Sequence, residues 1–347
     1  MKLLVSALEP SANLHLKEVL KHTENVELLG IFDKNICNNT PLYDISQMAI
    51  MGFVDTLKKI RWFFKVADEM VNLAKDVDKI LLMDSSGFNL PLAKKLKKAY
   101  PDKEIIYYIL PQIWASRPKR SIKLELYCDK LLGILPFEVD FYKSKAQYIG
   151  HPLLDEILLS DRNKESNTIA FMPGSRRAEI SKLLPIFKKV REKLNNKKAV
   201  IIIPSSFSQE KIKDLYGDIS QFEISTNTHD ALSNSEFAFI CSGTATLEAA
   251  LIGTPFTLSY IAKKVDYFVA IKLFKITDIG LANILLKHYN NTKLHNELLQ
   301  DEVTVDNLLN EYNNTDREIF ASKAQELRDY LAHGSSENVA KIIMDTK

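Results

Sequence analysis

The sequence has few cysteines, no long apolar run and almost no net charge, and each absence excludes a class of protein. Its three cysteines, Cys37, Cys128 and Cys241, lie far apart and match neither a disulfide framework nor a paired metal-ligand spacing. No uncharged apolar stretch approaches the ~20 residues that a membrane-spanning helix needs. Because 46 Lys and Arg stand against 44 Asp and Glu, any basic surface has to be local. We therefore expect a protein of a reducing compartment, without a metal site.

The first residues do not resemble a secretory signal. The opening MKLLVSALEPS has a short apolar run that meets Glu9 and Pro10 at once. We expect a cytoplasmic protein, or one attached to a membrane from the cytoplasmic side. Basic residues interleaved with aromatics occur only around Trp62, so nucleic-acid binding is not expected.

Short apolar runs alternate with amphipathic stretches along the whole chain. The runs do not alternate with polar residues, which is typical of strands buried on both faces of a parallel sheet. Lys- and Glu-bearing amphipathic stretches, such as 89–100 and 180–194, lie between them. The alternation indicates a doubly wound α/β architecture. The predicted strands are Leu3–Ala7, Leu28–Phe32, Lys79–Met83, Ile105–Ile109, Lys130–Ile134, Ile169–Met172, Ala199–Pro204 and Phe237–Cys241.

A polar segment near 155–168 divides the chain into two α/β halves. Its sequence LSDRNKESN has no periodicity and is typical of a linker. We expect one domain over residues 1–155 and a second over 164–332.

Ligands of open α/β sheets bind beyond the carboxyl ends of the strands, where loops lead into helix N-termini. One such junction contains Gly174, which permits close backbone approach, and Ser175, which is suited to cap the helix. Arg176 follows at a terminus that favours anions, and a guanidinium binds phosphate through paired hydrogen bonds. The alternative is a capped helix start with solvated arginines.

Two further junctions contain polar residues after a predicted strand. Ser242, Gly243 and Thr244 offer backbone and hydroxyl donors to a diphosphate. Glu248, one helical turn after Thr244, is placed to accept hydrogen bonds from ribose hydroxyls. Asp84 follows a strand of the first half, where a carboxylate can take a proton from an attacking hydroxyl. The alternatives are a small-residue helix start packed on the sheet, and a helix cap at Asp84.

Residues 48–67 predict an amphipathic helix. Spacings of 4, 3, 4 and 3 predict a core-facing set of apolar residues, namely Phe53, Leu57, Ile60, Phe64 and Ala67. The opposite face carries the basic residues Lys58, Arg61 and Lys65. We expect Trp62 and Phe63 to meet the lipid headgroup layer together with them. The alternative is an ordinary helix with Trp62 packed against a neighbour. A second basic and apolar stretch, 261–275, is a further candidate.

Taken together, the motifs resemble those of lipid-A-disaccharide synthases, in family order over nearly the whole chain. Ser6–His15 is similar to the family's opening SAGEPSGDLH, and residues 84–89 are similar to its D-x-P-D-F-N segment. The other matching segments are Pro111–Ala115, Leu135–Glu138, Gly150–Leu153, PGSR at 173–176, SGTATLE at 242–248, Gly280–Leu285 and Glu297–Asp301.

The resemblance implies a GT-B fold, with two Rossmann-like doubly wound domains facing each other across a cleft. The first domain, completed by a C-terminal helix at 333–347, then serves the acceptor and the membrane, and the second binds the UDP-sugar. The implied reaction is an inverting transfer from UDP-2,3-diacylglucosamine to 2,3-diacylglucosamine 1-phosphate (lipid X). It gives lipid A disaccharide 1-phosphate and UDP, without a metal or other cofactor, at the cytoplasmic face of the inner membrane. The family also allows a homodimer.

The resemblance also implies roles for individual residues. Asp84 matches the proposed general base and Arg176 the arginine expected near a phosphate. The implied UDP-sugar contacts are Gly174, Ser175, Ser242, Gly243, Thr244, Glu248 and Asn283. The implied acceptor-side residues are Glu9, Ser11, Asn13 and His15.

This sequence departs from the family pattern at the acceptor side. Leu8 and Ala12 replace the first loop's glycines, Asn13 replaces its aspartate, and Gly87 replaces the second aspartate of D-x-P-D-F-N. Because Leu8 and Ala12 have side chains that glycine lacks, they leave less space for a ligand to approach the backbone of this loop. Two other functions use the same architecture and motifs: a UDP-sugar epimerase, and a catalytically silent nucleotide-sugar- or lipid-binding protein.

Overall fold

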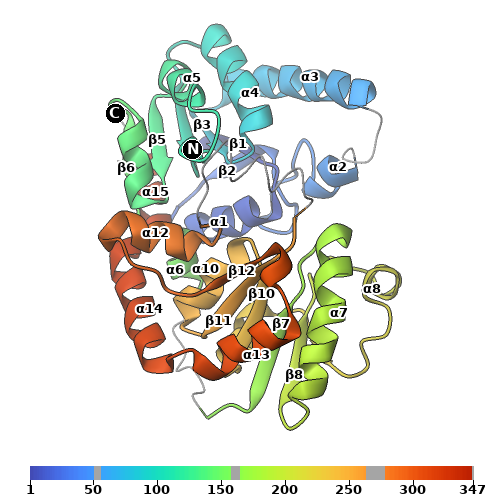
Figure 1. Cartoon of the computed structure of the whole chain (residues 1–347). Coiled ribbons are helices and arrows are strands. Elements are labelled where there is room, and N and C mark those ends of the chain that lie inside the picture. The colour runs from blue at the N-terminus through green and yellow to red at the C-terminus, as the bar shows by residue number, and fades with distance from the viewer. Residues whose placement is uncertain (51–55, 158–164, 263–277, 346–347) are drawn as a thin grey trace. The chain divides into compact units, whose positions relative to one another are not determined.

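A computed structural model of the chain consists of two compact units, which are described separately below (Figure 1). Unit 1 is Met1–Glu156 with Leu331–Lys347, and unit 2 is Ile157–Tyr330. Each unit contains a six-stranded parallel sheet flanked by helices, which confirms the predicted α/β fold class. The structure describes residues 1–50, 56–157, 165–262 and 278–345.

The sheet of unit 1 has the strand order β2-β1-β3-β4-β5-β6, and its strand pairs are parallel. Its strands are β1 (Lys2–Ala7), β2 (Glu27–Ile31), β3 (Lys79–Met83), β4 (Glu104–Tyr108), β5 (Lys130–Gly133) and β6 (Ala146–Tyr148). Its helices are α1 (Pro10–Leu20), α2 (Ile45–Ile50), α3 (Thr56–Leu73), α4 (Ser86–Ala99), α5 (Arg120–Tyr127), α6 (Pro152–Glu156) and α15 (Ser335–Met344), with short 3-10 turns at Ala74–Asp76 and Pro136–Phe141.

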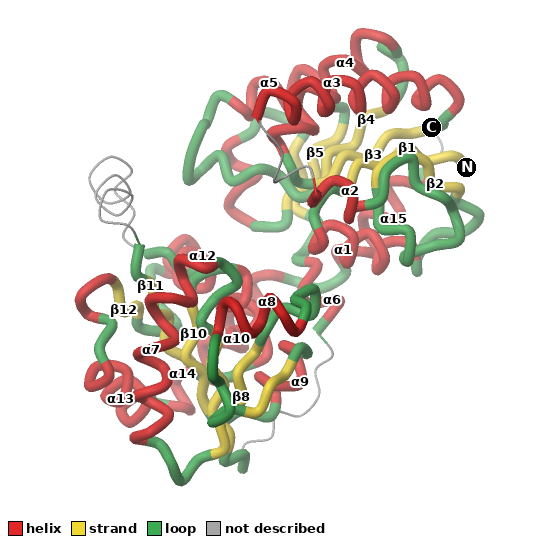
Figure 2. The backbone as a smooth tube through the Cα atoms, turned by 90° about the vertical axis from the view of Figure 1, so that its right-hand side faces the viewer, coloured by secondary structure: helices red, strands yellow, loops and turns green. Residues whose placement is uncertain are grey.

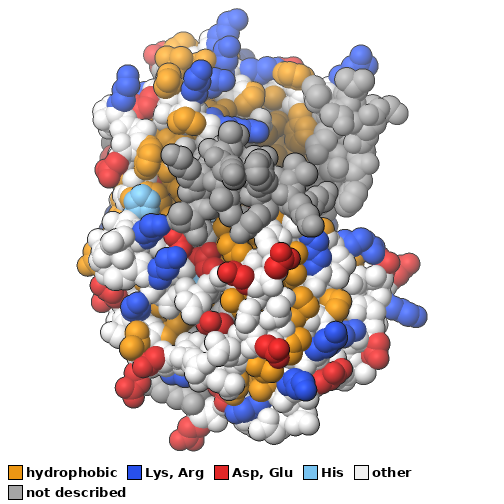
Figure 3. Space-filling model, viewed as in Figure 1, with side chains coloured by type: hydrophobic (Ala, Val, Ile, Leu, Met, Phe, Trp, Pro, Cys, Tyr) orange, Lys and Arg blue, Asp and Glu red, His pale blue; other side chains and the backbone are white. Residues whose placement is uncertain are grey.

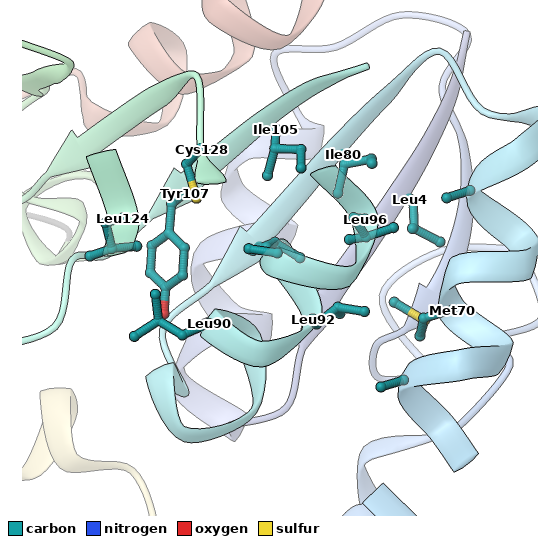
Figure 4. Packing of buried hydrophobic residues seen from close by; sticks show 14 of the residues in the cluster. Leu4, Met70, Ile80, Leu90, Leu92, Leu96, Ile105, Tyr107, Leu124 and Cys128 are labelled. Atoms are coloured by element: carbon teal, nitrogen blue, oxygen red, sulfur yellow. The ribbon is translucent and has the colours of Figure 1, made fainter. Parts of the chain in front are cut away.

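Helices cover both faces of this sheet. Because its strands are therefore buried on both sides, their sequences are unbroken apolar runs. Figure 2 shows α3, α4 and α5 on one side of the strands, and α1 and α15 on the other. Tyr107 belongs to the first core and the adjacent Tyr108 to the second, because successive strand residues point to opposite faces. Figure 4 shows Leu90, Leu124 and Cys128 around the ring of Tyr107.

The C-terminal helix α15 is part of unit 1 although it follows unit 2 in the chain. Its Val339, Ala340 and Ile343 are buried in the same core as β1 and α1. The N-terminus of α15 is held by Asp155, whose two carboxylate oxygens accept hydrogen bonds from the backbone N–H groups of Gly334 (2.8 Å) and Ser336 (2.7 Å).

The sheet of unit 2 has the order β12-β11-β10-β7-β8-β9 and is also parallel. Its strands are β7 (Thr168–Met172), β8 (Lys198–Ile202), β9 (Glu223–Ser225), β10 (Phe237–Cys241), β11 (Phe256–Tyr260) and β12 (Glu297–Leu299). Its helices are α7 (Arg177–Lys193), α8 (Gln209–Tyr216), α9 (Thr228–Ser233), α10 (Thr244–Ile252), α12 (Leu281–Asn290), α13 (Val305–Asn314) and α14 (Arg317–Leu331), with a 3-10 turn at Gln300–Glu302. Phe171, Phe187, Phe237 and Phe239 form the aromatic centre of one core.

All eight predicted strands are present, with ends that shift by at most two residues. Four strands were not predicted: β6, β9, β11 and β12. Three of these have only three residues, too few to form a recognisable apolar run. The predicted linker and the candidate membrane segment 261–275 fall largely on residues 158–164 and 263–277, outside the described residues.

Candidate functional site

Each sheet has a topological switch point, where ligands of open α/β sheets bind. In unit 1 it lies between the neighbouring strands β1 and β3, which lead into the segments with Glu9 and Asp84. In unit 2 it lies between the neighbouring strands β7 and β10, which lead into the segments with Gly174 and Ser242. The predicted site segments therefore follow the two strands at each switch point.

The backbone after β3 is strained at the predicted catalytic residue. Asp84 has a φ of 47° and Ser85 a φ of 36°, and after the adjacent β4 the β-branched Ile109 has a φ of 64°. Left-handed conformations at such residues cost on the order of 1–3 kcal/mol each and cluster at functional sites. Three residues with left-handed backbone conformations thus follow two adjacent strands, β3 and β4, at the carboxyl edge of the unit 1 sheet.

Asn89 holds the Asp84 segment in this conformation. Its Nδ2 donates to the carbonyls of Met83 (2.9 Å) and Asp84 (3.1 Å), and its Oδ1 accepts from Ser6 Oγ (2.6 Å). The hydroxyl of Tyr107 donates to the Asp84 carbonyl as well. Sequence analysis did not identify Asn89 as a site residue; the available signal was its place as the last residue of the segment 84–89 that is similar to D-x-P-D-F-N. In the structure its amide is fully buried.

Burial raises the pKa of the Asp84 carboxyl above its ordinary value. A hydrogen bond from the backbone of Ser85 opposes this rise, the negative charge of Glu9 adds to the rise, and the charge of His15 opposes it. The loops after β1 and β3 also meet directly, because Ser85 Oγ donates to Glu9 Oε1 at 3.2 Å. Asp84 and three of its neighbours therefore form one electrostatic group.

The other predicted acceptor-side residues differ in their surroundings. Glu9 is the N-cap residue of α1 and is exposed, as is Ser11 in the first turn. Asn13 is buried: its Nδ2 donates to the carbonyls of Ala7 and Glu9 (2.9 Å each), and its Oδ1 accepts from the Asp33 N–H (2.7 Å). Its amide is thus used to hold the first loop. The Nδ1 of the buried His15 contacts a carboxylate oxygen of Glu156.

A cavity of about 500 Å³ opens beside this segment within unit 1. Most of its lining is apolar, and it comes from the first loop, α3 and α4: Leu8, Phe63, Phe64, Ala67, Phe88 and Pro91. Glu9, Ser85 and Lys95 contribute its polar side chains. Its volume and apolar walls are those of a small-molecule pocket with a few fixed polar groups.

The predicted orientation of α3 is wrong in two respects. Trp62 is half-buried and packs on the core, with its ring 5.4 Å from that of Tyr43 in an edge-to-face contact. Phe64, predicted to face the core, is 55% exposed. The buried side of the helix continues through Val66 and Met70. Val66 was not among the predicted core-facing residues, and Met70 lies beyond the predicted helix, 48–67.

Phe63, between Trp62 and Phe64 in α3, is half-buried and packs against Phe88 of α4. Arg61 and Lys65 are exposed, as predicted. Phe53 and the side chains of Leu57, Lys58 and Ile60 lie outside the described residues. Within the described part of the chain, no helix has the length and apolarity needed to cross a membrane.

In unit 2 the PGSR segment follows β7, but its helix cap differs from the prediction. Arg176, not Ser175, is the N-cap residue of α7. The carboxylate of Glu179 takes the role expected of a cap, because Oε2 accepts from the N–H groups of Ser175 (3.3 Å) and Arg176 (3.2 Å). The Arg176 side chain is 81% exposed and pairs with Glu179 Oε1 at 2.9 Å. Gly174 has a φ of 102°, a backbone conformation that favours glycine.

The SGT segment leads into α10 without a side-chain cap. Gly243 is the N-cap residue, with a φ of 131°, and no acidic residue occupies the first turn. Ser242 and Glu248 are half-buried, and Thr244 is exposed. Because a helix N-terminus carries partial positive charge and N–H donors, this end of α10 is chemically suited to an anion.

Asn283 is fully buried near the start of α12. Its Nδ2 donates to the His295 carbonyl (2.9 Å) and to Glu297 Oε1 (2.8 Å), and its Oδ1 accepts from the N–H groups of Leu294 (2.9 Å) and His295 (3.2 Å). These bonds fasten α12 to the segment before β12. The described residues contain no group of three or more His, Cys, Asp or Glu side chains that could hold a metal ion.

A family model and the curated relatives of similar sequence both identify the same protein family. A family model described as lipid-A-disaccharide synthetase matches residues 3–345. The chain is 48% identical to the lipid-A-disaccharide synthase of Helicobacter pylori strain G27 over 351 residues, which cover 97% of this chain and 96% of the relative. It is 47% identical to that of Campylobacter jejuni strain RM1221, with 98% of each chain covered.

Solved structures with the same fold are much less similar in sequence. A putative UDP-N-acetylglucosamine 2-epimerase from Listeria monocytogenes superposes with a TM-score of 0.59 at 13% identity, covering 99% of this chain and 94% of the other. A spinosyn rhamnosyltransferase complexed with thymidine diphosphate gives 0.61 at 11% identity, covering 99% and 100%. Since one is named an epimerase and the other a transferase, the fold alone does not distinguish these activities.

Proposed function

Because this chain belongs to the lipid-A-disaccharide synthetase family, we propose how its two units carry out the synthesis of the lipid A disaccharide. Family membership makes the chain a glycosyltransferase of the GT-B fold. We assign the binding of UDP-2,3-diacylglucosamine to unit 2 and the binding of lipid X to unit 1. The observation that carries the assignment is the strained Asp84 segment, which lies beside an apolar cavity at the switch point of unit 1.

The proposed reaction is a single displacement with inversion at the anomeric carbon. The 6-hydroxyl oxygen of lipid X attacks C1 of the donor sugar, and the bond from C1 to the phosphate oxygen breaks. The electron pair of that bond leaves with UDP, and the hydroxyl proton passes to the carboxylate of Asp84. A general base at this position contributes typically 10²–10⁴-fold to the rate.

The donor diphosphate is assigned to the N-terminus of α10, with contacts from Ser242, Gly243 and Thr244. The absence of a side-chain cap and of first-turn acids supports this choice over α7. At α7 the carboxylate of Glu179 already binds the N–H groups of Ser175 and Arg176. The exposed guanidinium of Arg176 is proposed to exchange Glu179 for a phosphate oxygen as negative charge develops on UDP.

The cavity beside Asp84 is assigned to an acyl chain of lipid X. Leu8, Phe63 and Phe88 supply apolar walls, which gain free energy by covering hydrocarbon. Leu8 occupies a position at which the family's first loop has a glycine. This substitution therefore adds an apolar side chain to the lining of the cavity.

Attachment to the cytoplasmic face of a membrane is proposed through the exposed side of α3. Phe64, Arg61 and Lys65 project from it, and Figure 3 shows hydrophobic side chains beside Lys and Arg side chains over α3 and α4. An aromatic side chain among basic residues suits an anionic headgroup layer.

The test is turnover of UDP-2,3-diacylglucosamine with lipid X in detergent micelles. Wild type should release disaccharide and UDP, and Asp84→Asn should lower kcat by about 10² or more, because its amide takes no proton. Arg176→Ala should lower kcat/KM by a similar factor. Arg177→Ala is the matched control, because that arginine pairs with Asp214 on the exposed surface.

Three outcomes would overturn the assignment. Asp84→Asn with wild-type kcat removes Asp84 as the base. Folded wild type that binds UDP without turnover is a silent binding protein, and epimerised UDP-sugar identifies an epimerase.

A further inference from the structure

One side of α4 lines the cavity of unit 1 with residues that disfavour a helix. Gly87, Pro91 and Lys95 lie four residues apart, so they follow one another along this side. Leu92 and Leu96, which Figure 4 shows in the core, belong to another side of the helix. Glycine and proline are the two residue types least favourable in helices. Proteins break such local preferences chiefly at functional sites.

The fold of α4 does not require a glycine at position 87. Gly87 has a helical backbone, without the positive φ that favours glycine elsewhere in this chain. A Cβ added to it would come within 4 Å of no atom in the described part of the chain beyond its own turn of helix. Alanine therefore fits the protein at this position, and its methyl group would instead occupy space in the cavity that Gly87 lines.

Pro91 changes the hydrogen bonding of the Gly87 carbonyl. In a regular helix the N–H at position 91 donates to the carbonyl oxygen four residues earlier, which is that of Gly87. Proline has no N–H, and its ring crowds the carbonyl at this spacing. The Gly87 oxygen thus lacks its usual helical donor, at a residue without a side chain. A backbone carbonyl beside an apolar cavity is the kind of polar group that orients a ligand.

The same cavity reaches the segment of the proposed base. Ser85, the residue after Asp84, lines it together with Gly87. Its apolar walls include Phe63 and Phe88, whose rings contact each other with centroids 5.5 Å apart. A sugar bound beside Asp84 and a hydrocarbon chain bound between these walls are therefore connected across Gly87.

We propose that Gly87 and Pro91 form the binding site for the amide that links an acyl chain to the sugar of lipid X. The chain passes over Gly87 into the cavity, and the Gly87 carbonyl accepts a hydrogen bond from the amide N–H. The amide is that of carbon 2 of glucosamine, where the acylated group is an amine. The inference rests on the proposed binding of lipid X to unit 1 and names the group by which this acceptor is recognised.

The test compares lipid X with an analogue in which an ester oxygen replaces the amide N–H at carbon 2. Calorimetric dissociation constants in detergent micelles measure binding without turnover. Wild type should bind the amide about threefold to tenfold more tightly, which is the usual effect of one neutral hydrogen bond. Equal affinity of wild type for the two ligands would overturn the proposal.

Pro91→Ala supplies an N–H to the Gly87 carbonyl. The preference for the amide should fall to within about twofold, because the helix then uses the same oxygen. Loss of the proline ring from the cavity wall affects both ligands alike, so the ratio of the two affinities isolates the hydrogen bond. The Tm should be unchanged or higher, since alanine favours a helix.

Pro185→Ala is the matched control. Pro185 is an exposed interior proline of α7, in unit 2, and its substitution should leave the wild-type preference for the amide unchanged. A wild-type preference in Pro91→Ala contradicts the proposal, as does an equal loss of preference in Pro185→Ala.

Gly87→Ala tests the space beside the backbone. The dissociation constants of both ligands should rise by about tenfold, because the methyl group occupies the path of the chain. The Tm should be unchanged or higher, and UDP affinity should stay within about twofold of wild type, since UDP is assigned to unit 2. Wild-type affinity for lipid X in this variant would show that the chain does not pass over Gly87.

Turnover distinguishes failure of this inference from failure of the proposed function. If wild type prefers the amide in binding but forms no disaccharide, the proposed transfer fails and the amide site stands. If wild type forms disaccharide from the amide and the ester with equal KM and kcat, the transfer stands and the amide site fails.

Discussion

Some of the groups around Asp84 raise the pKa of its carboxyl and others lower it. Single substitutions can distinguish their contributions. Glu9 raises the pKa of Asp84, and it also accepts a hydrogen bond from Ser85. Glu9→Gln removes the negative charge and keeps an oxygen acceptor, so the pKa of Asp84 should fall. Because the base acts when deprotonated, the acid limb of the kcat profile should move to lower pH. Glu18→Gln is the control and should leave the limb in place, because the Glu18 carboxylate pairs with Lys21 at the other end of α1.

The buried His151 makes folding stability depend on pH. Burial lowers its pKa from the ordinary 6.5 to about 3, so the unfolded chain binds a proton first as the pH falls. Its contribution is complete above pH 6.5 and is lost progressively toward pH 3. At pH 5 the loss is about 2 kcal/mol.

Urea unfolding at pH 7 and pH 5 measures this dependence. In His151→Gln the decrease in unfolding free energy between the two pH values should be smaller by about that amount. The buried His295, whose pKa burial lowers to about 4, remains in both proteins and contributes equally. An unchanged decrease would show that His151 is already protonated in the folded state.

At the residue scale, sequence patterns predicted the segments of the candidate site but not the partners that their residues contact. The motif around Gly174 was recognisable, whereas the binding of Ser175 and Arg176 N–H groups by Glu179 depends on side-chain conformation. The contact between His15 and Glu156 joins residues 141 positions apart, and a single sequence contains no local pattern that predicts such a pair.

At the scale of elements, the segment between β7 and α7 depends on the absence of a side chain at Gly174. A Cβ there would lie 2.6 Å from Glu179 Oε2 and 3.3 Å from Cys241 Sγ, at a φ of 102°. Gly174→Ala should lower stability by about 2–3 kcal/mol and weaken UDP binding, since the segment has to shift. Calorimetry of UDP binding and thermal unfolding measure both effects.

Gly217 provides the comparison, since it also has a positive φ but has open space where a Cβ would be. Gly217→Ala should cost about 1 kcal/mol from backbone strain alone. Its UDP affinity should equal that of wild type. Equal effects of the two substitutions would rule out the proposed clash.

The phase of α3 gives a second prediction at this scale. Phe64→Ser should reduce binding to anionic liposomes, because Phe64 is exposed beside Arg61 and Lys65. Trp62→Ser should instead lower stability by about 2–4 kcal/mol, because the indole packs on the core. Liposome co-sedimentation and thermal unfolding of the two variants separate these effects. A loss of liposome binding with Trp62→Ser alone would restore the original prediction.

Sequence analysis predicted elements best where burial on both faces produced an apolar run. It missed β11, in which Thr257 and Ser259 interrupt the run although both are fully buried. It placed Phe64 on the core-facing side of α3 together with Ala67, but only Ala67 is buried there. The buried side of the described part of α3 runs through Val66, Ala67 and Met70.

At the scale of the whole molecule, each unit has its own cores, which predicts independent folding. Residues 157–330 made alone should fold and bind UDP. Residues 1–156 made alone should be unstable, because they lack Val339, Ala340 and Ile343 of α15. Circular dichroism and thermal unfolding test both fragments.

A short flexible linker from Glu156 to Leu331 should restore unit 1, since Asp155 already binds the start of α15. A fragment 1–156 as stable as the linked form would contradict the role of α15. The strand pattern predicted two α/β halves, whereas the return of a C-terminal helix to the first half was implied only by family resemblance.

The return of α15 also determines when each unit can be completed on the ribosome. Every residue of unit 2 is synthesised before Val339 and Ile343 exist, so unit 2 can fold while the α15 face of the unit 1 sheet is still uncovered. Domains usually fold in the order in which they are made. We therefore expect the first unit to begin synthesis to be the last to finish folding, and its nascent form to expose an apolar surface that chaperones can bind.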